Sequence, residues 1–108
     1  MVDFVTVVDN NIKQNISKNT ILDARLCVEE LLINIVKHGI KNDSKCYIDI
    51  IVRVKSEKLY ITIRDEGDIF DPIKYDKDSG LGLLLVNKKC KVINYSRCIG
   101  QNNTFLVF

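Results

Sequence analysis

The chain is predicted to adopt an α+β fold, a two-layer α/β sandwich with helices on one face of a mixed, mostly antiparallel sheet. The order of its segments predicts this fold: helical patterns come first, and a β-β-α-β-β succession follows. Such an order is typical of a sheet whose helices are segregated to one side. Its 108 residues are enough for one hydrophobic core and too few for two. We therefore expect a single domain over residues 1–108.

The composition is that of an ordinary globular chain. Hydrophobic residues make up 46% and charged residues 28%, and the net charge is +2 with both signs interspersed. Basic residues do not gather on one surface, so nucleic acid is not an expected partner. No window reaches the roughly 20 apolar residues of a membrane span, and we expect no signal peptide. The four cysteines lack metal-ligand spacing. We therefore expect free thiols and a location in the reducing cytoplasm.

The first part of the chain is predicted to be helical. Residues 1–15 fit a helix or a strand, and we favour a helix because their apolar residues form a helical stripe. Asn19-Thr20 is a candidate N-cap for a long helix over 20–38. Gly39 is expected to end that helix as its C′ residue.

Four runs of β-branched and aromatic residues predict strands in the second part of the chain. They are residues 47–54, 59–65, 92–98 and 104–108. Turn signals stand at 56–58 and at 100–103. Between the second and third strands we expect a long loop over 66–79 and then an apolar helix over 80–90.

A polar line runs along the long predicted helix. Glu30, Asn34 and His38 are spaced four residues apart, so their side chains share one face of a helix that is otherwise mostly apolar. A carboxylate and an amide buried there without partners would cost several kcal/mol. They therefore need either partners within the protein or a wet cleft that holds a polar ligand. His38 is more typical of a residue at a helix C-terminus than of a catalytic group.

Two further segments are candidates for ligand binding. Asp65-Glu66-Gly67 follows a predicted strand, where on its own it would form a turn. Ser79-Gly80-Leu81-Gly82 opens a predicted helix. Glycines at such a junction let backbone N–H groups approach an anion at the positive end of the helix dipole. By itself the glycine pattern is weak evidence, since glycines also open helices for packing reasons.

Together, the three features resemble the N, G1 and G2 boxes of the GHKL superfamily of ATP-binding domains. The matching positions are Glu30 and Asn34 in the N box, Asp65 and Gly67 in G1, and Gly80 and Gly82 in G2. The likeness is closest to the anti-sigma-factor serine/threonine kinases, and it extends from about residue 20 to the C-terminus. The resemblance implies a Bergerat-type fold with ATP and Mg²⁺ as cofactors.

The resemblance also implies a role for each matched side chain. Asn34 would give its amide oxygen to Mg²⁺, a hard cation that prefers oxygen ligands. Glu30 would be the general base that polarises the attacking hydroxyl or water. Asp65 would accept a hydrogen bond from the adenine amino group, Gly67 would let the chain pass close to the purine, and Thr104 would support Asp65.

The phosphate contacts and the protein partners follow from the same resemblance. Backbone donors of Gly80, Leu81 and Gly82 would hold the phosphates. The implied activity is phosphorylation of a small anti-anti-sigma protein on serine, and a sigma factor is the second implied partner. Homodimerisation stays open.

The sequence leaves two alternatives to the serine/threonine kinase. A non-catalytic module that binds ATP or ADP and changes its affinity for a protein partner is favoured by Ile69, which replaces the last glycine of the usual D-x-G-x-G pattern. The short lid over 73–79 favours it too, whereas intact Glu30 and Asn34 favour the enzyme. A histidine kinase is disfavoured because the single histidine, His38, lies within the N-box helix.

Overall fold

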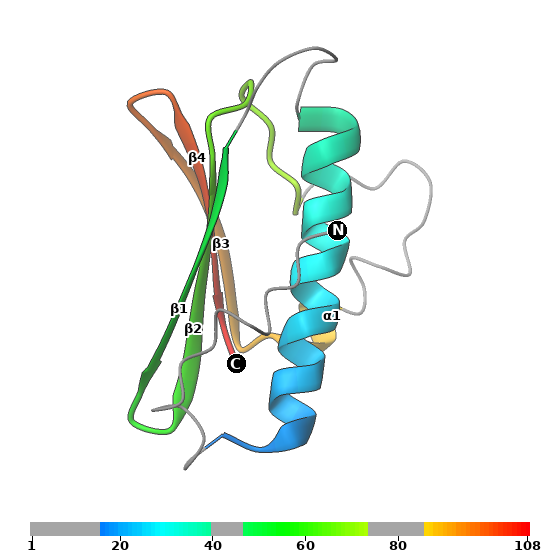
Figure 1. Ribbon diagram of the computed structural model, residues 1–108, viewed down its shortest axis with the longest axis vertical. Helices are drawn as coiled ribbons and strands as arrows, with labels where there is room; N and C mark the ends of the chain where they lie inside the picture. The colour runs from blue at the N-terminus through cyan, green and yellow to red at the C-terminus, as the bar shows by residue number, and fades with distance from the viewer. Residues whose placement is uncertain (1–15, 40–46, 74–85) are drawn as a thin grey trace.

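The computed structural model describes residues 16–39, 47–73 and 86–108, and these form two layers (Figure 1). One layer is helix α1 (Lys18–Asn34), and the other is a four-stranded sheet. The strands are β1 (Ile48–Lys55), β2 (Lys58–Asp65), β3 (Val92–Cys98) and β4 (Gln101–Val107). Residues 86–89 are helical and contribute Val86 to the core. The α+β sandwich predicted from the sequence is confirmed, whereas the helix predicted over 1–15 lies outside the described residues.

Helix α1 begins and ends differently from the prediction. Ser17 is the N-cap, and its Oγ accepts a hydrogen bond of 3.1 Å from the backbone N–H of Thr20. The predicted cap at Asn19-Thr20 was therefore two residues too late. At the other end α1 does not stop at a C′ glycine but continues as a π-helical turn, η3 (Ile35–Gly39). Such turns are rare in proteins, and those that occur often lie at functional sites.

The sheet has the order β1-β2-β4-β3, and every pairing among these strands is antiparallel. Both of its hairpins turn on two residues with positive φ, which is the type I′ geometry that matches the twist of the strands. These residues are Ser56 and Glu57 in one hairpin, and Ile99 and Gly100 in the other. Because the second turn is so tight, β4 begins at Gln101, and the predicted turn at 100–103 is wrong for residues 101–103.

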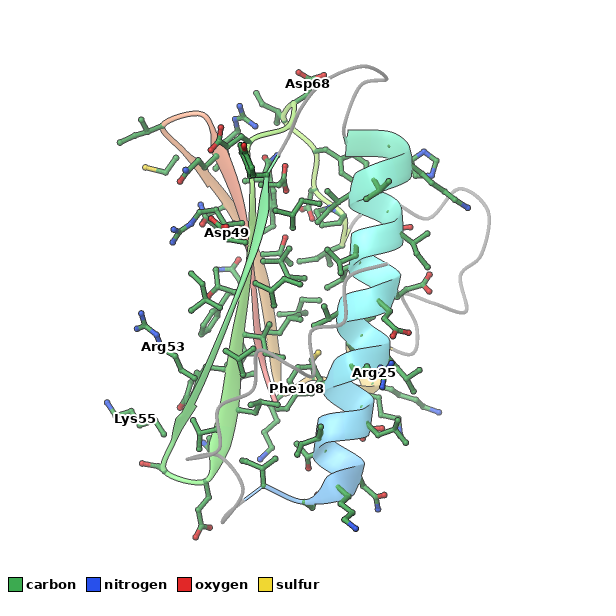
Figure 2. The ribbon with its side chains drawn as sticks, in the orientation of Figure 1. Arg25, Asp49, Arg53, Lys55, Asp68 and Phe108 are labelled. Carbon is green, nitrogen blue, oxygen red and sulfur yellow. The ribbon has the colours of Figure 1, made fainter. Side chains whose placement is uncertain are left out.

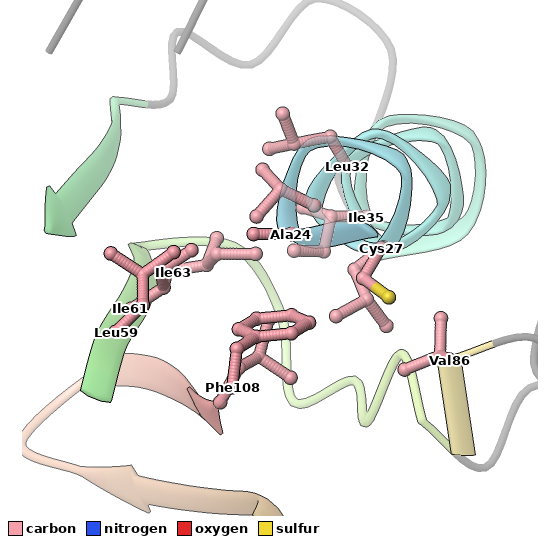
Figure 3. Packing of buried hydrophobic residues seen from close by; sticks show 12 residues of the cluster. Ala24, Cys27, Leu32, Ile35, Leu59, Ile61, Ile63, Val86 and Phe108 are labelled. Carbon is pink, nitrogen blue, oxygen red and sulfur yellow. The ribbon is translucent and has the colours of Figure 1, made fainter. Parts of the chain in front are cut away.

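The core lies between α1 and the inner face of the sheet. On α1 and the first residue of η3 the buried apolar residues recur at helical spacing, namely Ala24, Cys27, Val28, Leu31, Leu32 and Ile35. On β2 they alternate as Leu59, Ile61 and Ile63, because successive residues of a strand point to opposite faces. Figure 3 shows Phe108 facing the underside of α1 in the same cluster. Burial of this apolar surface holds the two layers together.

The outer face of the sheet is polar, with an aromatic pair in the middle. Tyr60 and Phe105 stack there with ring centroids 6.2 Å apart. Figure 2 shows Asp49, Arg53 and Lys55 on β1 pointing away from α1. This alternation of polar outward and apolar inward residues is the usual pattern of an antiparallel sheet that is covered on one side.

Candidate functional site

The inner face of the sheet changes from apolar to polar along β2 and β4. Three successive cross-strand pairs on this face are Ile61 with Leu106, Ile63 with Thr104, and Asp65 with Asn102. The same alternation that buries the isoleucines thus carries Asp65, Asn102 and Thr104 to the inner face, where each is 2% exposed or less. The predicted purine-site residues Asp65 and Thr104 therefore lie beside each other on neighbouring strands.

Asp65 is held through one of its two carboxylate oxygens. Its Oδ1 accepts hydrogen bonds from the backbone N–H of Gly67 and from Nδ2 of Asn102, both 2.9 Å long. No residue in the described part of the chain bonds to Oδ2. A buried carboxylate with one engaged and one open oxygen can accept a hydrogen bond from a ligand.

Thr104 does not make the contact that the sequence suggested. We expected it to support Asp65, but Asn102 makes that hydrogen bond instead. The hydroxyl of Thr104 is buried and has no hydrogen-bond partner in the described part of the chain. Buried hydroxyls are nearly always paired, so an orphaned one beside Asp65 fits a ligand that would complete it.

Asn102 is the site residue that the sequence interpretation missed, because it was assigned to a turn. Its Nδ2 also donates to the backbone carbonyl of Asp68, at 2.8 Å. Its Oδ1 accepts from the Tyr95 hydroxyl and from Nη1 of Arg97, the latter at 3.0 Å. The signal that could have found it is the alternation along β4, which runs inward through Leu106 and Thr104 and reaches Asn102 next.

Asn34 has one side of its amide engaged and the other open. Its Nδ2 donates to the carbonyl of Pro72 at 3.3 Å, and the side chain is buried. Its Oδ1 has no hydrogen-bond partner in the described ranges 16–39, 47–73 and 86–108. The amide thus keeps an oxygen for a hard cation, which is the donor type that Mg²⁺ prefers.

Glu30 lies one helical turn before Asn34 and is half-buried. None of the described residues forms an ion pair or hydrogen bond with its carboxylate. The neighbouring Glu29 differs, since its Oε1 accepts from Nε of Arg25 at 3.1 Å. The two adjacent glutamates are therefore distinct: Glu29 belongs to a surface ion pair, and Glu30 is open to a ligand or to solvent.

The last residue of η3 contacts the loop that follows β2. The backbone N–H of Asp68 donates to the carbonyl of Gly39 at 3.2 Å. A Cβ added to Gly39 would come within 2.8 Å of Phe70 Cδ2, so the ring needs a glycine here. His38 contacts the same ring, with centroids 6.3 Å apart. Gly39 thus serves a close approach and not the left-handed C′ conformation that the sequence suggested.

The remaining predicted site residues divide into two groups. Ile69, which replaces the last glycine of the D-x-G-x-G pattern, is 77% exposed. Gly80, Leu81 and Gly82 lie outside the described residues, and the predicted lid is described only at residue 73. Within the described ranges no group of three His, Cys, Asp or Glu side chains is placed to hold a metal ion. A cation here would need ligands from Asn34, from water and from a bound substrate.

Two thiols, one on α1 and one that follows the helical residues 86–89, lie in or against the hydrophobic core. Cys27 is fully buried, and Cys90 is half-buried against the same cluster. A hydrogen bond from the Cys90 thiol lowers the pKa of Cys27, although burial opposes this shift. The same hydrogen bond, together with burial, raises the pKa of Cys90 above its ordinary value. Nearby, Lys89 Nζ pairs with Asp23 at 3.6 Å, so two contacts tie residues 89–90 to α1.

Comparison with known proteins identifies related sequences and related structures. A family model described as the histidine kinase-like ATPase domain matches residues 3–108. The serine-protein kinase RsbW of Staphylococcus aureus, from strains JH9 and Newman among others, is 37% identical, with 59% of this chain and 50% of RsbW covered. The chain therefore spans half the length of the curated relatives it matches.

One related structure supports the fold. It is the histidine kinase domain of a blue-light activated histidine kinase from Erythrobacter litoralis, which superposes with a TM-score of 0.64 at 21% identity. The superposition covers 82% of this chain and 47% of the matched chain. No helix in the described ranges is both long enough and apolar enough to cross a bilayer.

Proposed function

The chain belongs to the histidine kinase-like ATPase domain family, and on that premise we propose that it is an ATP-binding serine/threonine kinase of the anti-sigma type. The observation that carries the proposal is the orphaned Thr104 hydroxyl beside Asp65, whose Oδ2 is also open. A buried hydroxyl without a partner, beside a carboxylate with one open oxygen, favours a ligand that supplies both a donor and an acceptor. The amino edge of adenine has this combination.

The purine would bind at the end of β2. Asp65 accepts from the exocyclic amino group, and Thr104 completes its own hydrogen bonding on the same edge of the base. Gly67 is fixed by its N–H to Asp65 and by its carbonyl, which accepts from Arg97 Nη1 at 2.9 Å. Its lack of a side chain leaves room for a flat ring.

The phosphates would lie toward the end of α1. Asn34 offers its amide oxygen to Mg²⁺, and the backbone N–H groups of Gly80, Leu81 and Gly82 offer donors to phosphate oxygens. When bound, Mg²⁺ neutralises charge on those oxygens, which is the chief requirement of phosphoryl transfer. Glu30 accepts the proton of the attacking serine hydroxyl.

The partners proposed from the resemblance are a small anti-anti-sigma protein that carries the accepting serine, and a sigma factor. The curated relative at 37% identity is a serine-protein kinase, which supports serine as the acceptor. We retain the cytoplasm as the expected setting, and homodimerisation as an open part of the proposal. Analytical ultracentrifugation of the chain with and without ATP would test for a dimer.

Nucleotide binding is tested by the thermal shift that Mg-ATP produces. We expect a clear rise in the unfolding temperature of the wild-type chain at saturating nucleotide, because a ligand that binds only the folded state stabilises it. Asn34→Ala should abolish this rise. Asn94→Ala, an exposed asparagine on β3, is the matched control and should keep it. An undiminished shift in Asn34→Ala would contradict the assignment of Asn34.

Catalysis is tested separately from binding. Glu30→Ala should retain the affinity for ATP while transferring phosphate to a cognate acceptor at least about a hundredfold more slowly, as expected for a general base. Glu29→Ala is the control, because it removes a carboxylate of the same helix that is already paired with Arg25. Equal rates of phosphate transfer in the wild type, Glu30→Ala and Glu29→Ala would exclude Glu30 as the base.

A second candidate function is a non-catalytic module that binds nucleotide and changes its affinity for a protein partner. It is favoured by the absence, within the described residues, of any group that orients Glu30, since a catalytic base is normally held by a third residue. ATP binding without measurable transfer to any tested acceptor would support this candidate over the kinase.

A further inference from the structure

We infer that Asn102 is a positioning residue that sets the base selectivity of the site, because it turns Asp65 so that only a base with an exocyclic amino group finds a partner. The inference rests on the proposed nucleotide site and deepens it. Asn102 is 1% exposed and sits directly across from Asp65 in the register of β2 and β4. It therefore lies behind the proposed base-contacting residue.

All of the hydrogen-bonding capacity of Asn102 is in use. An asparagine amide has two N–H donors and an oxygen with two lone pairs. Both donors are engaged, by Asp65 Oδ1 at 2.9 Å and by the Asp68 carbonyl at 2.8 Å. Both lone pairs are engaged too, by Tyr95 and Arg97. A side chain held at four points has no freedom to rotate, so the donor that faces Asp65 stays in place.

The fixed donor decides which oxygen of Asp65 a ligand meets. Asn102 Nδ2 and the Gly67 N–H both bond to Oδ1, which leaves Oδ2 as the open oxygen. A carboxylate oxygen is an acceptor only. A base that presents an amino group forms a hydrogen bond with it, whereas a base that presents a carbonyl places two acceptors against each other. The site therefore rejects the carbonyl base through an unmade hydrogen bond, which is an efficient form of discrimination.

The β3–β4 hairpin supports this arrangement from one side. Arg97 Nη1 bonds to Asn102 Oδ1 and also to the Gly67 carbonyl, at 3.0 and 2.9 Å. The Tyr95 hydroxyl shares the same Oδ1. Arg97 and Tyr95 thus connect strand β3 to Asn102, and Arg97 also reaches the loop beside the proposed purine. Loss of either contact should loosen Asn102 and, through it, the orientation of the carboxylate.

The experiment compares ATP with inosine triphosphate, which carries a carbonyl in place of the exocyclic amino group. Affinities for both are measured by calorimetry with Mg²⁺ on the full chain. We expect the wild-type protein to prefer ATP by at least about a hundredfold. In Asn102→Ala the affinity for ATP should fall about tenfold while that for inosine triphosphate changes little, so the ratio narrows. Asn103→Ala, the next residue along β4 and bonded to Arg64 instead, should keep the wild-type ratio.

A milder variant guards against loss of folding. Tyr95→Phe removes one hydroxyl and one of the two hydrogen bonds to Asn102 Oδ1. The ratio of the affinity for ATP to that for inosine triphosphate should fall by about threefold, and circular dichroism should show an intact fold. If Asn102→Ala does not fold, this variant and its comparison with Asn103→Ala decide the matter.

The outcomes separate this inference from the proposed function. Wild-type preference for ATP together with an unchanged ratio in both variants would overturn the role of Asn102 and leave the proposed function standing. Equal losses for both nucleotides would show that Asn102 acts only on the fold of the site, and would also overturn it. Wild-type chain that binds neither nucleotide would refute the proposed function, and the inference would fall with it.

Discussion

The two ends of the interface between α1 and the sheet are built from the same elements but have opposite chemistry. At one end Ile61 and Leu106 face each other across β2 and β4, fully buried beneath α1. At the other end, four residues along each strand, Asp65 faces Asn102 and both are buried as deeply. Figure 2 shows Asp68, in the loop beside this polar end, at the end of the molecule where α1 finishes.

The difference shows what each end contributes. The apolar end stabilises the fold, because it buries hydrocarbon that needs no partner. The polar end is held by hydrogen bonds and still leaves three polar atoms without partners in the described residues: the Thr104 hydroxyl, Asp65 Oδ2 and Asn34 Oδ1. Of these atoms the Thr104 hydroxyl is buried, so its missing hydrogen bond costs stability, which fits the ligand-binding role proposed for this end.

The largest expected effect is at the apolar end. Ile61→Ala should lower the free energy of unfolding by about 3 kcal/mol, because it removes a fully buried side chain and leaves a cavity. Ile69→Ala, in the loop beside the polar end, is the matched control. Its side chain is 77% exposed, so the change should stay within about 0.5 kcal/mol. Urea denaturation measures both, and similar losses would contradict the assignment of the core.

The next effect is at the contact between η3 and the loop. Gly39→Ala should destabilise the chain by about 2 kcal/mol, because the new Cβ overlaps the Phe70 ring. It should weaken Mg-ATP binding as well, since it displaces the loop that follows Asp65. The double variant Gly39→Ala/Phe70→Ala removes the overlap. Its loss of unfolding free energy should therefore be smaller than the sum of the losses in the two single variants.

Gly39 and Gly100 are expected to be glycines for two different reasons, a close side-chain contact at Gly39 and a positive φ at Gly100. Gly100 has φ of +73° and no atom within 4 Å of an added Cβ. Gly100→Ala should therefore cost about 1 kcal/mol through backbone strain alone and leave Mg-ATP binding unchanged. A loss of nucleotide binding in this variant would show that strain in the hairpin, and not the Phe70 contact, governs the site.

At the polar end one change should stabilise the protein while harming its function. Thr104→Val keeps the shape of the side chain and removes the unpaired hydroxyl, so the free energy of unfolding should rise by about 1 kcal/mol. The affinity for ATP should fall. Thr62→Val, on the outer face of β2, is the control and should leave affinity unchanged. Lower stability in Thr104→Val would mean that the hydroxyl has a partner in the free protein.

The smallest effect concerns the thiols behind α1. The raised pKa of Cys90 means that the folded chain keeps a proton that the unfolded chain loses above the ordinary thiol value of 9.0. Stability should therefore fall as the pH rises past about 9. The lowered pKa of Cys27 acts in the opposite sense just below that value. Unfolding curves from pH 8 to 10 should show the fall in the wild type and a weaker one in Cys90→Ala.

Much of the candidate site was predictable because its residues follow simple periodicities. Glu30 and Asn34 were proposed from their four-residue spacing on a helix, and Asp65 from its place at the end of a strand. Asn102 was missed because the hairpin was expected to be wider than it is. The two-residue turn at Ile99 and Gly100 needs a non-glycine residue at positive φ, which sequence patterns disfavour.

What the sequence determined by itself was the fold class, the helical stripe and the polar residues that break it. These depend on local spacing, and local spacing decides which face of a helix or strand a side chain occupies. Only the tertiary structure decided that Asn102, and not Thr104, forms the hydrogen bond to Asp65. It also decided that Asn34 donates to the Pro72 carbonyl. The close approach of Phe70 to Gly39 likewise became apparent only in the folded chain. Each of these contacts joins residues from about 30 to 40 positions apart, and their pairing depends on strand register and loop path.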